Sequence, residues 1–225
     1  MTEAGAVELE SARVARMLRD DIMLGRRAPG SRLVERDIAA ELNVSRLPVR
    51  EAIRALVGEG IVVARPRTWA VVREFTARDI QDFSEVREAI ETVIFQFAAA
   101  RHDEEGLVQL REALDREAAA AEAGDILAGR SAAGEFHEVA ARLSGNDMLT
   151  ELIGVFVTRL RWLFGQHDDL AGMVAEHEEI FAAIAARDVE LLGDLVPQHL
   201  ARGRATAERR LREATGAPDR EAARP

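Results

Sequence analysis

The sequence predicts a mainly α-helical protein in two parts, the first of three helices and a β-hairpin and the second of six helices. Apolar residues recur at helical spacing along most of the chain, whereas strand-like runs occur only within residues 61–74. The length of 225 residues is comfortable for two domains. Hydrophobic residues make up 48% of the chain and aromatic residues only 4%, which favours cores of packed aliphatic helices.

Three helices are expected in the first part. Apolar spacing indicates one helix over about 7–24 and a shorter one over about 34–42. Asn43 can adopt the left-handed conformation that a tight turn requires, and Ser45 is a natural N-cap for the next helix. That third helix has one apolar face and ends near Gly58. A tight turn between two short helices is typical of a helix-turn-helix.

A β-hairpin is expected after the third helix. The β-branched runs IVVAR at 61–65 and AVVRE at 70–74 are joined by the turn-forming residues 66–69. Three helices followed by a hairpin make a winged helix-turn-helix, in which the hairpin is the wing. We assign residues 1–75 to this domain.

The second part is predicted to be entirely helical. Thr76 and Asp79 have the spacing of a capping box and mark the start of its first helix. We place an all-α six-helix domain at residues 76–213, followed by a disordered polar tail at 214–225. The six helices are expected at about 77–101, 104–123, 126–143, 146–165, 169–186 and 189–212.

Composition limits the class of protein. There are no cysteines, which excludes disulfides and thiolate metal sites and fits an intracellular protein. The chain starts MTEAGAVELE, with acids where a secretory signal would carry basic residues. No apolar run approaches the length of a membrane span. We therefore expect a cytoplasmic protein with no membrane partner.

The net charge of −10 is distributed unevenly. Residues 1–75 hold 13 Arg and 11 acidic residues, a balance of +2, whereas residues 76–225 carry −12. The balance of +2 is compatible with DNA binding, because affinity for DNA depends on where the charges lie rather than on their total.

Two arginines open the third predicted helix, one turn apart. A helix that starts with Arg46 and Arg50 and is supported by a second helix suits insertion into the DNA major groove. An arginine can donate two hydrogen bonds to guanine, which gives about 1–3 kcal/mol of discrimination between bases. Arg54 lies about 80° further round the helix axis than Arg46 and is a weaker candidate. Taken alone, the pair also fits a solvated helix face.

Two signatures in the chain resemble a known family. The first is PGSRLVERDIAAELNVSRLPVREAIRALVGEGIV at 29–62. The second consists of EVREAIE at 85–91, EFH at 135–137, SGN at 144–146, EHEEIFAAIAARD at 176–188 and QHL at 198–200. On these grounds the chain resembles GntR-superfamily transcription factors of the FadR-like branch, over about residues 8–212. Six helices in the second domain resemble the VanR-like subgroup of that branch.

The resemblance implies a double-stranded DNA operator as a partner. The base and phosphate contacts that it implies fall on Arg36, Ser45, Arg46, Arg50 and, in the wing, Arg67 and Thr68. Two residues depart from the family pattern. Leu47 replaces the usual threonine, which removes a polar contact, and Trp69 stands where the wing normally has glycine. Trp69 either stacks against DNA sugar or packs on the hairpin.

Three histidines fall on three different predicted helices. His137, His177 and His199 match no local metal motif, so their spacing alone favours ordinary, partly buried histidines. The resemblance implies instead that all three face an effector and hold a divalent metal such as Zn, Ni, Fe or Mn. The family's aspartate one turn before His137 is Ala133 in this chain. A weakened three-histidine metal site and a metal-free chamber that binds an anion therefore both remain open.

Arg87 is the residue that the resemblance places towards the effector, where it would clamp a carboxylate. The alternative is a surface ion pair with Glu91, four residues further along the helix. We expect a small organic acid as the effector, held by Arg87 and the three histidines. His102 and His167 lie at predicted helix ends and are expected to face solvent.

The sequence thus predicts a homodimeric transcriptional repressor that binds a palindromic operator and responds to a small carboxylate effector. We do not expect an enzyme. One alternative is a metal-dependent hydrolase that uses the three-histidine cluster, although no general base beside it is recognisable. The other is a non-specific architectural DNA binder, in which a helical domain with a charge of −12 would have no use.

Overall fold

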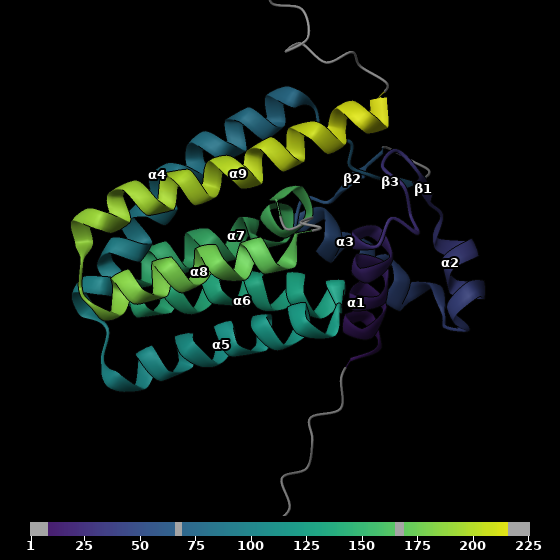
Figure 1. Ribbon diagram of the computed structural model, residues 1–225. Coiled ribbons are helices and arrows are strands. Elements are labelled where there is room, and N and C mark those ends of the chain that lie inside the picture. The colour runs from purple at the N-terminus through teal and green to yellow at the C-terminus, as the bar shows by residue number, and fades with distance from the viewer. Residues whose placement is uncertain (1–8, 66–68, 165–168, 216–225) are drawn as a thin grey trace, which may run out of the picture. The chain divides into compact units, whose positions relative to one another are not determined.

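The computed structural model describes residues 9–65, 69–164 and 169–215 (Figure 1). The chain divides into two compact units, Met1–Phe75 and Thr76–Pro225. Each unit buries its own set of apolar side chains. Among the described residues, no helix has both the length and the apolar character needed to cross a membrane.

The helices of the first unit are α1 (Glu10–Met23), α2 (Glu35–Leu42) and α3 (Arg46–Gly58). Val14, Leu18 and Ile22 recur every four residues and form the buried face of α1, which packs against α3. All three helices lie where the apolar spacing predicts them, and α1 begins three residues later than expected.

The turn between α2 and α3 aims the start of α3. Asn43 has φ 52° and ψ 48°, which is the left-handed conformation predicted for it. Ser45 has the extended backbone of an N-cap, but its hydroxyl makes no capping hydrogen bond. Because that hydroxyl is exposed and caps no helix donor, it is free to meet a ligand.

The wing is part of a three-stranded antiparallel sheet rather than a simple hairpin. Its strands are β1 (Arg32–Leu33), β2 (Val62–Ala64) and β3 (Ala70–Val72), in the order β1-β3-β2. Arg32 pairs with Val71 in the β1–β3 register. The sequence predicted β2 and β3 but not β1, because a strand of two residues is too short to show alternation. Residues 66–68 at the wing tip, with the candidates Arg67 and Thr68, lie outside the described residues.

The second unit is helical throughout its described residues. Its six helices there are α4 (Ala77–Arg101), α5 (Glu104–Ala123), α6 (Ile126–Leu143), α7 (Asp147–Phe164), α8 (Leu170–Ala185) and α9 (Val189–Thr215). The helix order is therefore as predicted, and the bounds of α4, α5 and α6 are the expected ones. The predicted tail begins inside α9, and residues 216–225 lie outside the described part of the chain.

Side-chain caps explain several of these helix starts. Thr76 accepts a hydrogen bond from the Asp79 amide while the Asp79 carboxylate accepts one from the Thr76 amide, which confirms the predicted capping box. Asp103, Asp125 and Asp169 each accept a hydrogen bond from the amide three residues later. Each cap satisfies a helix donor that would otherwise have no partner.

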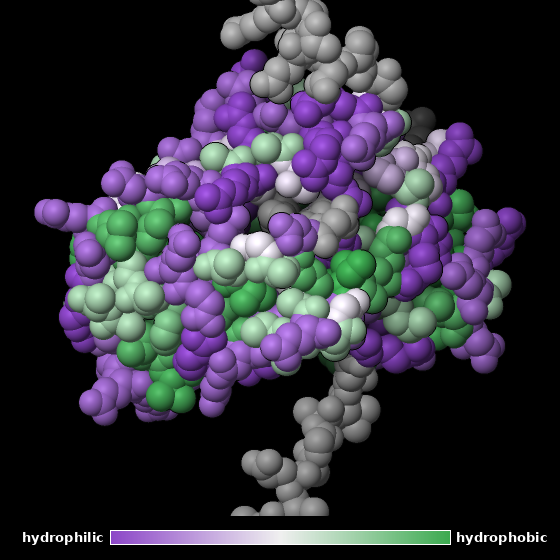
Figure 2. All heavy atoms as spheres, viewed as in Figure 1, coloured by the Kyte–Doolittle hydropathy of each residue, from purple (hydrophilic) through white to green (hydrophobic). Residues whose placement is uncertain are grey.

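Both distant and consecutive helices pair side by side in this unit. The long helices α4 and α9 run along each other, and α5 and α6 form a second pair (Figure 1). Phe95 of α4 and Phe136 of α6 are fully buried, with their ring centroids 6.0 Å apart. Hydrophilic side chains cover much of the surface seen in Figure 2, with smaller apolar groups between them. An enclosed site in this unit therefore lies between the paired helices, beneath the hydrophilic surface.

Candidate functional sites

The first candidate site is a concave surface on the first unit. It has a volume of about 730 Å³ and is bordered by the start of α2, the outer face of α3 and the strands. Five arginines in the described part of the chain border it: Arg36, Arg46, Arg50, Arg54 and Arg65. The side chains of Arg46 and Arg50 are 63% and 45% exposed, so both can reach a ligand without rearranging the core.

A single carboxylate holds the two arginines at the start of α3. The Glu35 carboxylate accepts two hydrogen bonds from Arg50, both at 2.9 Å, and one from Arg46 at 3.2 Å. The hydrogen bonds from Arg50, with help from Arg46, hold the pKa of the Glu35 carboxyl below its usual range. Glu35 lies 11 and 15 residues before these arginines, so no local spacing in the sequence pointed to it.

The other candidates on this surface are less constrained. The Arg36 side chain is 81% exposed and pairs only with its neighbour Asp37, at 3.0 Å. Arg54 also borders the concave surface, although its position round the helix axis made it the weaker candidate. Arg54 reaches this surface in spite of its position because the surface is wide and extends from α2 across the face of α3 to the strands.

Trp69 packs within the sheet region. The guanidinium carbon of Arg32 on β1 lies 4.3 Å from the centroid of the Trp69 ring, which is a cation–π contact. Trp69 is half-buried, and its carbonyl accepts a hydrogen bond from the Arg65 amide at 3.1 Å. These contacts agree with the second alternative for Trp69, in which it packs on the protein rather than against DNA sugar.

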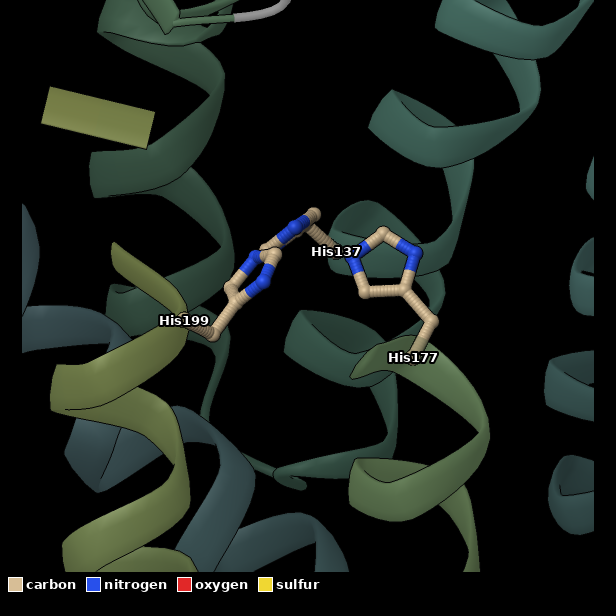
Figure 3. A group of neighbouring side chains, drawn as sticks. All are labelled: His137, His177 and His199. Carbon is tan, nitrogen blue, oxygen red and sulfur yellow. The ribbon is translucent and has the colours of Figure 1, made fainter. Parts of the chain in front are cut away.

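The second candidate site is a histidine cluster inside the helical unit. His137 of α6, His177 of α8 and His199 of α9 turn their rings towards one another (Figure 3). Each offers one nitrogen, and these three nitrogens all lie within 4.8 Å of one another. Residues separated by up to 62 positions therefore meet in one place, which their spacing alone could not predict.

A glutamate lies against the Nδ1 atom of each histidine. His177 Nδ1 and Glu117 Oε2 are 2.7 Å apart, as are His199 Nδ1 and Glu176 Oε2. His137 Nδ1 lies 2.8 Å from Glu91 Oε2, although out of line for a hydrogen bond. An Nδ1–H that donates to a carboxylate leaves Nε2 as the nitrogen with a free lone pair.

The cluster is enclosed, and burial keeps two of its histidines neutral. Burial lowers the pKa of His199 to about 3, and burial likewise lowers the pKa of His137. Both imidazoles are therefore uncharged near pH 7. His177 Nε2 is buried and has no hydrogen-bond partner among the described residues, which is unfavourable for a polar atom unless something binds there.

A small cavity of about 50 Å³ adjoins the three histidines. Arg87, Ala133, Met173 and Leu160 are among the residues that line it. A single water needs about 10–15 Å³ by the same measure, so the cavity has room for a few waters or a very small ligand.

Arg87 and Glu91 do form the ion pair that was the alternative for Arg87. The pair lies inside the unit rather than on its surface. Arg87 Nε donates to Glu91 Oε1 at 2.7 Å, and the two side chains are only 10% and 3% exposed. The alternative placed the pair on the surface, whereas α4 turns this face towards the cavity, where Arg87 was expected to face. Burial alone would raise the pKa of the Glu91 carboxyl, but Arg87 and His137 outweigh it and hold that pKa far below its usual range.

Comparisons with known proteins identify the family. Residues 82–202 match the FCD domain, and residues 10–72 match the bacterial regulatory proteins of the gntR family. The chain is a GntR-family regulatory protein with an FCD domain. The HTH-type transcriptional repressor RspR of Escherichia coli (strain K12) is 27% identical over 203 residues, which cover 88% of this chain and 89% of RspR.

Two further relatives agree with this GntR assignment. An HTH-type transcriptional regulator of Streptomyces ambofaciens is 31% identical over 188 residues, covering 81% of this chain and 78% of that protein. The crystal structure of a GntR transcriptional regulator from Rhodococcus sp. RHA1 has a TM-score of 0.74 and 31% identity, covering 93% of this chain and 99% of that one. The GntR protein is thus a DNA-binding transcriptional regulator and not an enzyme, and the hydrolase alternative finds no support.

The FCD domain of this GntR protein lacks one carboxylate on α6. Ala133 is buried at the cavity wall, where the resemblance implies an aspartate. Glu135 pairs with Arg116 outside the cavity. Glu138 borders the cavity, but its carboxylate pairs with Arg161 at 2.6 Å. The carboxylate beside His137 comes instead from Glu91 of α4.

His102 corrects one further expectation for the FCD domain. It was expected to face solvent at a helix end, but it is only 9% exposed, and its Nε2 lies 3.1 Å from the Ile184 carbonyl. Arg187 donates to the carbonyls of Ala99 and His102, which holds the end of α4 against the end of α8. This packing of helix ends leaves His102 little access to solvent. His167 lies outside the described residues.

Proposed function

We propose that this GntR protein is a homodimeric repressor that binds a palindromic operator and is modulated by a small carboxylate bound in its FCD domain. The observation that carries the proposal is the enclosed cluster of three histidines beside Arg87, in a different unit from the exposed arginines of α3. One unit thus offers groups suited to DNA, and the other offers groups suited to a small anion with a metal.

The DNA contacts that we propose centre on α3. Arg46 and Arg50 lie in its first two turns, where a recognition helix meets base edges. Glu35 holds both guanidiniums in place before DNA arrives, which reduces the entropy lost on binding. Arg36 and Ser45 are exposed beside them and suit phosphates, and Arg67 and Thr68 keep the same proposed role in the wing.

The residues of the cluster fit a divalent metal. A carboxylate beside each Nδ1 and an unpartnered buried Nε2 on His177 form the arrangement by which proteins orient histidines towards a metal. When bound, a divalent Zn, Ni, Fe or Mn ion would supply positive charge and open coordination positions for a carboxylate. The alternative of imidazolium groups that bind an anion is disfavoured, because His137 and His199 are neutral near pH 7.

The effector that we propose is small and acidic. A cavity of about 50 Å³ excludes a large organic molecule in this conformation. Arg87 lines the cavity with its guanidinium already paired to Glu91, so an incoming carboxylate would share that guanidinium. The effector changes operator affinity only if it binds the two conformations of the dimer unequally.

A gel-shift titration tests this function. DNA from around the protein's own gene is titrated with the protein, with and without Zn²⁺ and a panel of small mono- and dicarboxylic acids. We expect sequence-dependent binding that at least one acid weakens. Equal binding to operator and random DNA, or no response to any acid with metal present, would contradict the proposal.

A further inference from the structure

The first turn of α3 carries an exposed leucine beside its arginines. Leu47 is 60% exposed. Its neighbours Arg46 and Arg50 are held by Glu35 and have polar partners. The Leu47 side chain has no polar atom, so a contact that it makes with DNA is an apolar one.

Helical geometry places Leu47 directly opposite the buried face of α3. That face consists of Pro48, Val49, Ala52, Ile53 and Leu56. At about 100° per residue, the direction of Leu47 is about 180° from the centre of this face. In the first turn of a recognition helix, the side chain that points away from the protein core is the one that enters the groove most deeply.

We infer that Leu47 reads a thymine in the operator through the 5-methyl group of that base. The thymine methyl is the apolar group that base pairs display in the major groove, and an aliphatic side chain recognises it by contact. The inference rests on the proposed docking of α3 by Arg46 and Arg50. It adds an apolar specificity position beside the polar contacts of the two arginines.

Binding to uracil-substituted operators tests this inference. Each thymine of one operator half-site is replaced in turn by deoxyuridine, which removes the methyl group and keeps every hydrogen-bonding edge. For the wild-type protein we expect one position at which the substitution weakens binding about fourfold, the ratio that corresponds to about 0.8 kcal/mol for one buried methyl. Leu47→Ala should bind the thymine and uracil versions of that site equally.

Controls separate this result from general loss of binding. Leu152→Ala removes another exposed leucine, from the helical unit, and should keep the full thymine preference of the wild type. An unchanged melting temperature of Leu47→Ala is expected, because the residue is outside the core.

Three outcomes would overturn the inference. The first is a wild-type protein that is indifferent to uracil at every position, and the second is a Leu47→Ala variant that keeps the thymine preference. Absence of wild-type binding to any duplex would overturn it together with the proposed DNA contacts. The first outcome, found together with loss of operator binding in Arg50→Ala, would contradict the leucine contact and leave the proposed arginine contacts in place.

Discussion

Glu35, the first residue of α2, accepts hydrogen bonds from Arg46 and Arg50 at the start of α3. The N–H groups that donate these bonds would otherwise be available to DNA. Such an ion pair has two opposing effects. The negative charge reduces attraction to any phosphate backbone, while the fixed guanidiniums favour the one base sequence that they fit. Glu35 is therefore expected to influence specificity more than affinity.

Replacement of Glu35 tests this role. Glu35→Gln should raise affinity for random DNA by up to about fivefold, which corresponds to an exposed ion pair of about 1 kcal/mol. The ratio of operator to random-DNA affinity should fall, because the arginines lose their fixed orientation. Glu51→Gln makes the same charge change on the exposed side of α3 without these contacts. Anisotropy titrations in which both variants keep the wild-type ratio would contradict the role.

Glu117 of the FCD domain orients His177 in the way that Glu35 orients the arginines of α3. It is fully buried, and its carboxylate lies 2.7 Å from Nδ1 of His177. Glu117→Gln should lower Zn²⁺ affinity about 10- to 100-fold, the usual effect of losing a carboxylate behind a histidine ligand. Glu178→Gln alters an exposed glutamate next to His177 whose partner is Arg111, and should leave Zn²⁺ affinity unchanged. Competition with a chromophoric chelator measures both, and equal affinities in the two variants would argue against the site.

These residues show what a sequence can and cannot predict about a site. Arg46 and Arg50 were predictable because they share one helix face, so local periodicity brings them together. The three histidines needed a family resemblance, since they come from three helices. Glu35, Glu117 and Glu176 had no signal, because each meets its partner only through tertiary packing.

At the scale of elements, helix starts and apolar spacing were sufficient to predict the helices. The bounds of α4 to α6 agree with expectation because Thr76, Asp103 and Asp125 cap their starts and apolar faces run their length. Strand β1 was missed because it is defined by pairing with β3 rather than by its own two residues. The burial of His102 was missed for a similar reason, since contacts between helix ends create it.

Close packing between α5 and α6 gives a test at this scale. A Cβ atom added at Gly106 would overlap with a methyl group of Leu143, whereas one added at Gly154 of α7 would meet nothing within 4 Å. Gly106→Ala should therefore lower the free energy of unfolding by about 1–3 kcal/mol. Gly154→Ala should raise it by up to about 1 kcal/mol, because alanine is the better helix former. Urea titrations that find the same sign for both substitutions would contradict this packing.

At the scale of the whole molecule, the two units carry different charge and different chemistry. The balance of +2 in residues 1–75 and −12 in residues 76–225 directs DNA to the first unit. The FCD domain buries a small set of ionisable groups, Arg87, Glu91, Glu117, His177 and His199, and their charge states are coupled to folding and to metal binding. Acid should therefore act mainly on the second unit.

The pH dependence of stability follows from the buried histidines. The folded pKa of His199 is about 3, below the ordinary value near 6.5, so the unfolded chain binds the proton more readily. The contribution of His199 to the free energy of unfolding is therefore largest above about pH 6.5. It decreases as the pH falls from there, by about 2 kcal/mol at pH 5. The lowered pKa values of Glu91 and Glu176 act in the same direction at more acidic pH.

Thermal unfolding of metal-free protein between pH 7 and pH 5 measures this dependence. The melting temperature should fall with pH in the wild type and less steeply in His199→Gln, which has no imidazole to protonate. A wild-type melting temperature that stays level over this range would show that the histidine is not buried as the structure has it.

The most direct measurement is an anisotropy titration of one labelled operator with the wild type, Arg50→Ala and His177→Ala, each with and without Zn²⁺ and the effector acid. The account predicts that Arg50→Ala weakens operator binding about tenfold or more, from the loss of base contacts worth about 1–3 kcal/mol. It also predicts that His177→Ala binds the operator like the wild type but no longer responds to metal and acid. Wild-type operator affinity in Arg50→Ala, or an unchanged response in His177→Ala, would contradict it.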